Sequence, residues 1–437
     1  MRQKLARRDK FPLLVELEPL FQCNLACSFC GKIQHPEHIL RKRMPVEEAL
    51  AAVEECGAPM VSIAGGEPLV HPEVHVLARE LVRRRKFVFL CTNAILMKKK
   101  MDLFEPSPYF AWVVHLDGMR ERHDRFVERE GVFDLAVEAI AEAKRRGFRV
   151  NTNTTFLTTD TPKTVREVLD FLNDELEVDA MTISPAYAYE KAPDQEHFPG
   201  VTQTRRLFRE AFANGGRKRW RLNHTPLFLD FLEGKVDFGC TAWGIPSYSV
   251  FGWQRPCYLM ADGYAKTYRE LVETTDWSAY GRGRDPRCDN CMAHCGYEPT
   301  AVLRTAGSLR EIVRAVWTPF AASAQARGKR PVHAGQRAVD GNGKREPARH
   351  DHERAVAGDR VHDRLRHALR GDGPGPAPRI RGASALEEGG GDDAGADEGH
   401  ADARAGELLA EALGEDGDGA LRGRVDGLPL RSDVAGD

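Results

Sequence analysis

The sequence predicts an α/β protein: a parallel sheet with helices outside it, then a small cysteine-containing region and a disordered tail. Short β-rich segments alternate with amphipathic segments between residues 13 and 184, which is typical of parallel sheets. Ten cysteines form an early and a late group, and aromatic residues end at residue 320. For 437 residues the length predicts two to three domains, which we place at 1–190, 191–316 and 317–437.

The predicted strands are apolar and rich in β-branched or aromatic residues, and each is followed by polar residues. They are Leu13–Leu17, Met60–Ala64, Phe87–Cys91, Trp112–Leu116, Arg149–Thr155 and Met181–Ser184. Amphipathic helices are predicted between them at Val46–Cys56, Val74–Arg84, Phe133–Arg146 and Lys163–Leu172. Pro45 suits a first helical turn and Gly57 a helix end, which supports the first of these helices.

The early cysteines lie on one loop after the first predicted strand. Cys23, Cys27 and Cys30 follow the spacing C-x3-C-x2-C, and three thiols leave one without a disulfide partner. Thiolates are the soft ligands of iron–sulfur clusters, so these three can hold three irons of a four-iron cluster and leave the fourth iron open to a small molecule. The alternatives are buried structural cysteines or a zinc loop, and zinc would need a fourth ligand from elsewhere.

This spacing, with Phe29 directly before the third cysteine, resembles the radical S-adenosylmethionine (SAM) superfamily. The resemblance implies a partial (β/α)6 barrel and a [4Fe–4S] cluster whose open iron binds SAM. In parallel barrels the chemistry lies at the carboxyl ends of the strands. The second strand ends in Gly65-Gly66-Glu67-Pro68, which resembles the superfamily's motif for the SAM amino group.

Other strand ends supply further candidates for SAM binding. Asn93 follows the third strand and Asp117 follows the fourth. Asn151, Asn153 and Thr155 alternate along the fifth strand and share one face. Facing inward, these three side chains would bind the ribose hydroxyls and the methionine carboxylate; facing outward, they would be an ordinary polar strand surface.

Two residues near strand ends are candidate catalytic residues. Cys91 closes an apolar strand, where a cysteine usually acts as a small hydrophobe, although a thiol facing a radical site is a good hydrogen-atom donor. His115 ends the fourth strand, where a histidine is more often a packing residue than a catalyst.

The late cysteines are a second candidate metal site. Cys257 together with Cys288, Cys291 and Cys295 offers four thiolates for an auxiliary Fe–S cluster or a zinc ion, and Cys240 lies upstream of them. The alternative is a set of reduced thiols packed in a small domain. Aromatic residues between Trp220 and Tyr264 fit an ordinary core or the wall of a pocket for a bulky apolar substrate.

Composition excludes several classes of protein. The net charge of −2 gives no reason to expect a nucleic-acid partner, and no apolar run is long enough to span a membrane. The chain lacks the apolar stretch of a signal peptide, and ten cysteines then indicate a reducing cytoplasm. Residues 321–437 contain no Phe, Trp, Tyr, Cys or Met, which predicts disorder apart from a short helix at Ala405–Leu413. The abrupt onset of this composition also suggests translation in a shifted reading frame.

Several longer strings resemble one family within the superfamily, the adenosylhopane synthases of hopanoid biosynthesis. They include Ser62–Leu69, Cys91–Ala94, Val114–Gly118, Ala188–Gln195 and Val250–Leu259, and the match covers about residues 1–316. The resemblance implies that a donor such as flavodoxin or ferredoxin reduces the cluster and that SAM yields a 5′-deoxyadenosyl radical. That radical adds to the alkene of diploptene, an apolar triterpene, and the adduct radical is then quenched. It also implies peripheral contact with the inner membrane.

Two other functions fit the same sequence. A radical SAM enzyme with an auxiliary cluster could abstract hydrogen from a peptide or small metabolite, and would release free 5′-deoxyadenosine. A non-enzymatic metal-binding protein would bind no SAM, and would hold zinc with little iron.

Overall fold

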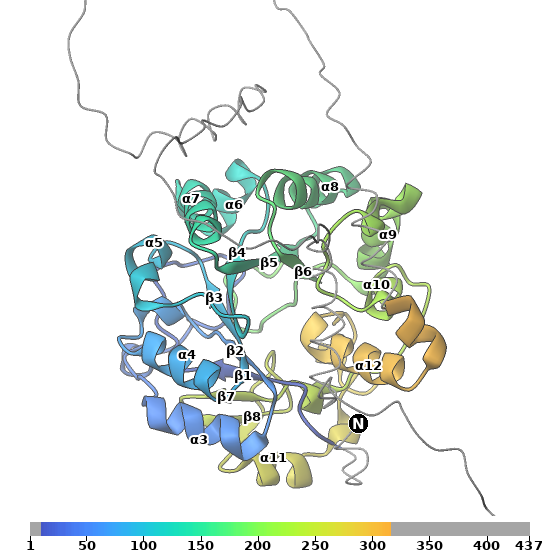
Figure 1. The fold of residues 1–437 in the computed structure, drawn as a ribbon. Coiled ribbons are helices and arrows are strands. Elements are labelled where there is room, and N and C mark those ends of the chain that lie inside the picture. Colours follow the sequence, from blue (N-terminus) through green and yellow to red (C-terminus); the bar gives the residue numbers. More distant parts are fainter. Residues whose placement is uncertain (1–9, 316–437) are drawn as a thin grey trace, which may run out of the picture. The chain divides into compact units, whose positions relative to one another are not determined.

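The computed structural model describes residues 10–315. The tail, its expected helix and the reading-frame hypothesis lie outside these residues. The described residues form one nine-stranded sheet with the strand order β6-β5-β4-β3-β2-β1-β7-β8-β9. Figure 1 shows helices arranged around the outside of this curved sheet.

Six parallel strands form the body of the sheet, and each pairs with its neighbour in the chain. This confirms the predicted α/β fold of a partial barrel. Strand ends differ from the predicted ones by no more than two residues. The strands are β1 (Leu14–Glu18), β2 (Met60–Ile63), β3 (Phe87–Thr92), β4 (Phe110–His115), β5 (Arg149–Phe156) and β6 (Ala180–Pro185).

Helices follow the strands on the outer face. The helix α3 begins after Pro45 and ends at Gly57, whose left-handed φ of 71° suits a residue without a side chain. The helix α8 begins at a capping box, in which Thr161 and Thr164 each accept from the other's backbone N–H. The helices of this half are α2 (Glu37–Leu40), α3 (Val46–Cys56), α4 (Val74–Arg83), α5 (Met97–Lys100), α6 (Arg120–Phe126), α7 (Val132–Arg145) and α8 (Pro162–Asp170).

The two faces of the sheet differ in chemistry. One face contributes alternate apolar residues to the core shared with the helices, for example Val15, Val61, Leu90, Trp112 and Val150. Because side chains alternate along a strand, the residues between them face the concave interior. These interior residues are largely polar: Glu16, Glu18, Ser62, Cys91, His115, Asn151, Asn153, Thr155, Thr182 and Ser184.

Three short strands from the second half extend the sheet beyond β1, which sequence analysis missed. The strand β7 (Ser247–Ser249) pairs parallel to β1, and β8 (Gly252–Arg255) and β9 (Gly263–Ala265) follow in antiparallel order. Trp253 on β8 is fully buried and belongs to the main core. Trp220, Phe228 and Phe231 also lie in that core, so much of this aromatic segment is ordinary core.

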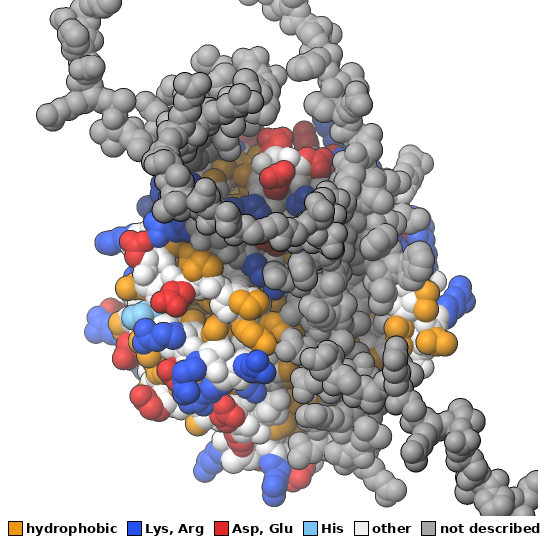
Figure 2. Space-filling view, viewed as in Figure 1, with side chains coloured by type: hydrophobic (Ala, Val, Ile, Leu, Met, Phe, Trp, Pro, Cys, Tyr) orange, Lys and Arg blue, Asp and Glu red, His pale blue; other side chains and the backbone are white. Residues whose placement is uncertain are grey.

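The remaining helices are α9 (Val201–Ala211), α10 (Pro226–Leu232), α11 (Tyr268–Thr274) and α12 (His294–Ala306). No helix among residues 10–315 has both the length and the apolarity needed to cross a bilayer. Figure 2 shows both signs of charge interspersed over the described part of the visible face.

Candidate active site

The cysteine loop, which we define as residues 19–36 with Cys23, Cys27 and Cys30, follows β1. All three thiols are free and partly exposed. Burial raises the pKa of Cys23 to about 11, and it also raises the pKa of Cys27 and of Cys30. Thiolates are therefore costly on this loop unless a metal compensates their charge.

The glycines after β2 hold the cysteine loop in place. Gly66 N–H donates to the Leu20 carbonyl at 3.0 Å, and Glu67 N–H donates to the Gln22 carbonyl at 2.9 Å. A side chain on Gly65 or Gly66 would collide with backbone of residues 20–22. The absence of side chains at both positions therefore permits a close approach of two backbone segments, and the expected close approach to a ligand stays a prediction.

The Glu67 side chain is buried and forms hydrogen bonds within the protein. Its side chain is 1% exposed, and it accepts hydrogen bonds from Leu69 N–H at 3.0 Å, the Thr92 hydroxyl at 2.9 Å and Asn93 N–H at 2.8 Å. Burial raises its pKa to about 7. This carboxyl group ties the end of β2 to the end of β3, and its contact with the SAM ammonium stays a prediction.

Asn93 also contacts the cysteine loop. Its side-chain amide donates to Asn24 Oδ1 at 2.7 Å and lies 3.8 Å from Cys23 Sγ, and its Oδ1 accepts from Ile95 N–H. These contacts position the cysteine loop beside the end of β3, and the role of Asn93 in SAM binding stays a prediction.

His115 and Asp117 form an ion pair of 2.6 Å between Nε2 and Oδ2. Burial lowers the pKa of His115, but the Asp117 carboxylate raises it by more, so the net shift is upward. Burial raises the pKa of Asp117, and His115 lowers it by more. Asp117 Oδ1 accepts from Thr155 N–H at 2.7 Å, so this buried carboxylate orients His115 and anchors β5. Its contact with SAM stays a prediction. The Phe29 ring lies 6.4 Å from the His115 ring.

The fifth strand carries the strongest indication of a ligand. Asn151 is 3% exposed, and the side-chain oxygens of both Asn151 and Asn153 are buried without a hydrogen-bond partner. Their neighbours Val150 and Phe156 lie in the outer core, so the two amides and Thr155 face the concave interior. Buried polar atoms without partners are rare in folded proteins, and a ligand with N–H or O–H donors would satisfy them.

Cys91 faces the same interior and contacts Ser62. The Ser62 hydroxyl lies 3.5 Å from Cys91 Sγ and 3.2 Å from Glu16 Oε1. Glu18, two residues after Glu16 on β1, pairs with Lys32, whose Nζ lies 3.1 Å from Glu18 Oε2. Lys32 also donates to the Tyr258 carbonyl at 2.8 Å, which connects the cysteine loop to the second half of the chain.

The cysteine loop fits an iron–sulfur cluster better than a single ion. Among residues 10–315, no three Cys, His, Asp or Glu side chains have the arrangement of a site for one metal ion. A four-iron cluster offers a different iron to each thiolate, so its ligands need not converge on one point. Together with the orphaned amide oxygens across the interior, the residues present fit a cluster with SAM bound to it.

The late cysteines are brought together by the fold. Burial, then the charges of Cys257 and Cys288, raise the pKa of Cys291 to about 12. Burial and the neighbouring thiols also raise the pKa of Cys295. A methyl group on Gly296 would lie 2.5 Å from Cys240 Sγ, so Cys240 belongs to the same set. Metal binding by Cys257, Cys288, Cys291 and Cys295 stays a prediction.

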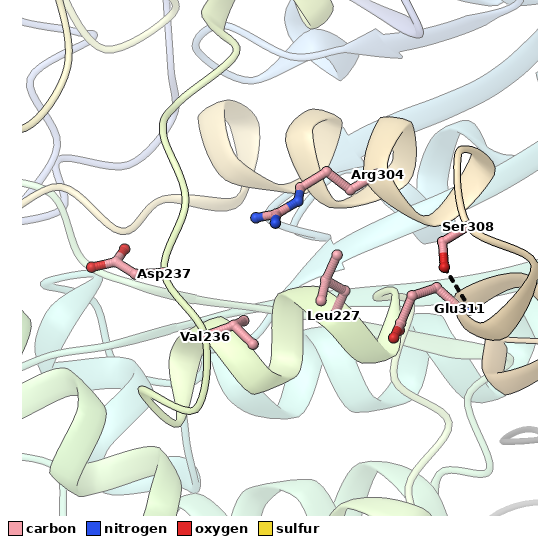
Figure 3. A pocket seen from close by; sticks show the side chains of 6 residues that line it. All are labelled: Leu227, Val236, Asp237, Arg304, Ser308 and Glu311. Carbon is pink, nitrogen blue, oxygen red and sulfur yellow. Dashed lines mark hydrogen bonds between the residues drawn. The ribbon is translucent and has the colours of Figure 1, made fainter.

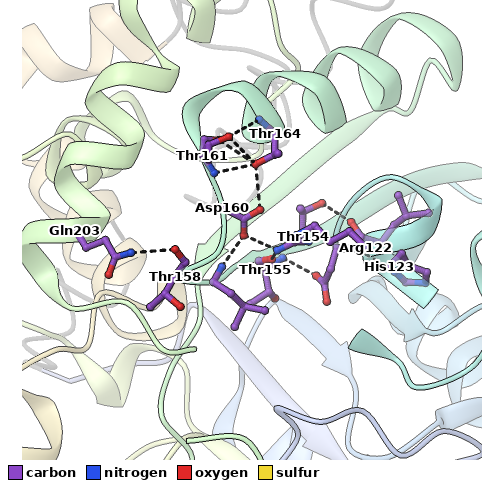
Figure 4. Close-up of polar contacts among 12 residues, drawn as sticks. Arg122, His123, Thr154, Thr155, Thr158, Asp160, Thr161, Thr164 and Gln203 are labelled. Atoms are coloured by element: carbon purple, nitrogen blue, oxygen red, sulfur yellow. Dashed lines mark hydrogen bonds and ion pairs between the residues drawn. The ribbon is translucent and has the colours of Figure 1, made fainter. Parts of the chain in front are cut away.

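Two cavities lie outside this interior. The larger, about 490 Å³, is lined by side chains of α10, α12 and the segments beside them (Figure 3), none of which is a predicted site residue: Leu227, Val236, Asp237, Arg304, Ser308 and Glu311. The smaller, about 70 Å³, adjoins Asp117 and includes Arg122 and Asp160. Figure 4 shows Asp160 at the centre of a polar network, where it accepts from Leu157 N–H at 2.7 Å and pairs with Arg122.

Four residues near the site were not predicted from the sequence: Glu16, Glu18, Lys32 and Arg122. The two glutamates alternate with apolar residues in Leu14-Val15-Glu16-Leu17-Glu18, and this period of two was a signal that both face the interior. Lys32 and Arg122 lie outside the strands, so no local pattern indicated their positions.

Two family descriptions match the chain. Residues 17–172 match the Radical SAM superfamily, and residues 181–315 match a domain of unknown function, DUF3463. The first segment contains the end of β1, the cysteine loop and the strands β2 to β5.

Curated relatives are moderately similar. A GTP 3′,8-cyclase of Clostridium perfringens (strain 13 / Type A) is 25% identical over 232 residues, which cover 50% of this chain and 69% of that protein. An Fe-coproporphyrin III synthase of Methanosarcina barkeri is 27% identical over 175 residues, covering 38% of this chain and 42% of that protein. The chain thus spans about two fifths to two thirds of these relatives.

Solved structures share the fold. Streptococcus suis SuiB bound to the precursor peptide SuiA aligns with a TM-score of 0.52 at 15% identity, covering 67% of this chain and 72% of that one. SuiB bound to S-adenosylmethionine aligns with a TM-score of 0.50 at 17% identity, covering 65% and 69%.

Proposed function

We propose that this chain is a radical SAM enzyme that adds the 5′-deoxyadenosyl group of SAM to the alkene of a hopene-type hydrocarbon such as diploptene. The orphaned amide oxygens of Asn151 and Asn153, which face the same interior as the cysteine loop, carry the proposal that SAM binds here. The choice of an alkene acceptor rests on the strings that resemble the adenosylhopane synthases, among them Val250–Leu259.

In this proposal Cys23, Cys27 and Cys30 hold the [4Fe–4S] cluster. When bound, the cluster supplies the electron that cleaves the sulfur–carbon bond of SAM. Asn151 and Asn153 accept hydrogen bonds from donors on SAM, either its ammonium group or its ribose hydroxyls. Asn93 and Glu67 act indirectly, because they fix the cysteine loop against the ends of β2 and β3.

The charge of the interior favours a substrate without phosphates. Two carboxylic acid side chains, Glu16 and Glu18, face it from β1, and the Lys32 ammonium group is already paired with Glu18. A nucleoside triphosphate, the substrate type named by the GTP cyclases among the relatives, would find the cation beside these two side chains, Lys32, already paired. An uncharged hydrocarbon has no such conflict.

After the addition, the adduct carbon radical must gain a hydrogen atom. We assign its donor as Cys91, because its thiol faces the interior from β3 and burial raises its pKa to about 12, which keeps the hydrogen on sulfur. His115 is paired with Asp117 and lies near Phe29, so we assign it to positioning of the loop.

A second candidate is hydrogen abstraction from a peptide or a small metabolite. The late cysteines favour it, since they offer an auxiliary cluster, and the fold is shared with SuiB, whose structure contains a precursor peptide. For either reaction we propose a flavodoxin or ferredoxin as electron donor. A triterpene substrate would further require peripheral contact with a membrane.

Product analysis separates these functions. The full chain is reconstituted anaerobically with iron and sulfide, then incubated with reductant, SAM and diploptene, and products are identified by mass spectrometry. An adenosyl–hydrocarbon adduct supports the proposal, and free 5′-deoxyadenosine as the main product contradicts it. Cys23→Ala, Cys27→Ala and Cys30→Ala should each lose the visible absorbance of the cluster and SAM cleavage. Cys56→Ala, which removes a buried free thiol from α3, is the matched control and should keep both.

A further inference from the structure

Three polar side chains on neighbouring strands form a continuous line of contacts across the interior. Glu16 on β1 and Ser62 on β2 occupy paired positions in the sheet register. The Ser62 hydroxyl lies between Glu16 Oε1 at 3.2 Å and Cys91 Sγ at 3.5 Å. A hydroxyl group both accepts and donates a hydrogen bond, so it can pass a proton between two groups that do not touch.

The two groups at the ends of this line, the Glu16 carboxyl and the Cys91 thiol, differ in proton affinity. Burial, reinforced by the neighbouring carboxylate of Glu18, raises the pKa of Glu16 to about 8. Burial and the charge of Glu16 disfavour a thiolate at Cys91. The other charged groups that act on Glu16 are Glu18 and Lys32, which pair with each other. Glu16 thus keeps a proton near neutral pH at the point where a Cys91 thiolate is costly.

We propose that Glu16 delivers a proton through the Ser62 hydroxyl to Cys91, and thereby restores the thiol after each turnover. The inference rests on the proposed function, in which Cys91 donates a hydrogen atom to the adduct radical. It adds two residues to that step, Glu16 as proton donor and Ser62 as carrier.

The sulfur–hydrogen bond of Cys91 breaks and a carbon–hydrogen bond forms on the substrate, which leaves a sulfur-centred radical at Cys91. One electron from the same one-electron donor that serves the enzyme, a reduced flavodoxin or ferredoxin, converts this radical to a thiolate. Ser62 gives its hydroxyl proton to the thiolate and takes the proton of Glu16, and the Glu16 carboxylate regains a proton from water.

The test compares a single turnover with many turnovers on the reconstituted full chain, with diploptene, SAM and reduced flavodoxin. Glu16→Gln and Ser62→Ala should form one adduct per active site with the product distribution of the parent, because Cys91 still carries its hydrogen at the start. Later turnovers should slow by roughly 10²-fold, the loss expected when an internal proton donor is removed. Cys91→Ala should lack the normal product even in the first turnover.

Ser249→Ala controls for structural effects, since it removes a buried hydroxyl from β7 that accepts from Phe251 N–H and touches none of the three residues. It should turn over like the parent, and iron content and thermal unfolding are measured for every variant. If Glu16→Gln fails to bind its cluster, the relay is tested by the multiple-turnover rate of Ser62→Ala, which is the smaller change. Parent-like multiple turnover in Ser62→Ala would overturn the relay and leave the proposed function standing. A parent enzyme that forms no adduct would overturn the proposed function itself.

Discussion

Replacing Gly66 by Ala should displace the cysteine loop. The added methyl group would overlap the Gln22 carbonyl oxygen, lying 2.5 Å from the carbonyl carbon of Gln22 and 2.6 Å from the carbonyl oxygen of Phe21. Both obstacles are backbone, so no side-chain rotation relieves them. Overpacking of this kind costs about 1–3 kcal/mol, and the hydrogen bond from Gly66 N–H to Leu20 would add about 1 kcal/mol if it is lost.

Substitutions at two other glycines serve as controls, because they distinguish the effect of steric overlap from the effect of backbone strain. Gly57 has a φ of +71° with open space around it, so Gly57→Ala should cost about 1–2 kcal/mol from conformation alone. Gly307 has a φ of −91°, and a methyl group there would meet nothing closer than 3.5 Å. Gly307→Ala should change stability by less than about 0.5 kcal/mol.

The assay measures denaturant unfolding of the metal-free chain and iron bound per chain after reconstitution. Gly66→Ala should lose both stability and iron, because the methyl group pushes on residues directly before Cys23. Gly57→Ala should lose some stability and bind iron like the parent. Normal iron binding by Gly66→Ala would refute the reasoning that this glycine positions the cysteine loop.

Three further predictions follow from the contacts of the site. Glu67→Ala leaves three buried donors without their acceptor, at a cost of about 1–3 kcal/mol each. Denaturant unfolding should therefore show that the free energy of unfolding falls by roughly 3 kcal/mol or more. The control Glu105→Ala, in an exposed loop, should change it hardly at all. The ion pair between His115 and Asp117 makes its full contribution to stability between pH 3.8 and pH 6.5. That contribution is lost as pH rises above 6.5 through the raised pKa of His115. It is also lost as pH falls below 3.8 through the lowered pKa of Asp117. The difference in melting temperature between the parent and Asp117→Asn should therefore be largest between these pH values, and a constant difference from pH 4 to 9 would contradict the assignment. If the late cysteines hold a second cluster, Cys291→Ala should bind about half of the parent's iron, on the premise that both clusters hold four irons each; equal iron in both proteins would argue against a second cluster.

Much of the fold was predictable because its signals are local. Alternation of apolar strands with amphipathic helices predicted β1 to β6 within two residues at their ends. The spacing of Cys23, Cys27 and Cys30 predicted a cluster loop, since ligands for one cluster can lie close together in sequence. The period of two along β5 predicted that Asn151, Asn153 and Thr155 share one face, and the structure shows that this face points to the concave interior.

The strands β7 to β9 were missed because each is only three or four residues long. Such short strands carry no readable period, and β7 is defined by its pairing with β1, more than two hundred residues away in the sequence.

The sequence by itself therefore determined that three thiols share one loop and that Asn151, Asn153 and Thr155 share one face of a strand. Only the tertiary structure decided what those residues do there. Gly66 and Glu67 were predicted from their motif to lie at the SAM amino group, and the structure adds partners that no local pattern indicates: the backbone of residues 20–22 and the end of β3. The physical reason is that a hydrogen bond joins two groups, and a local sequence pattern identifies one group without showing which distant residue is its partner. Glu16, Ser62 and Cys91 became a line of contacts for the same reason, because parallel pairing brings distant strands side by side.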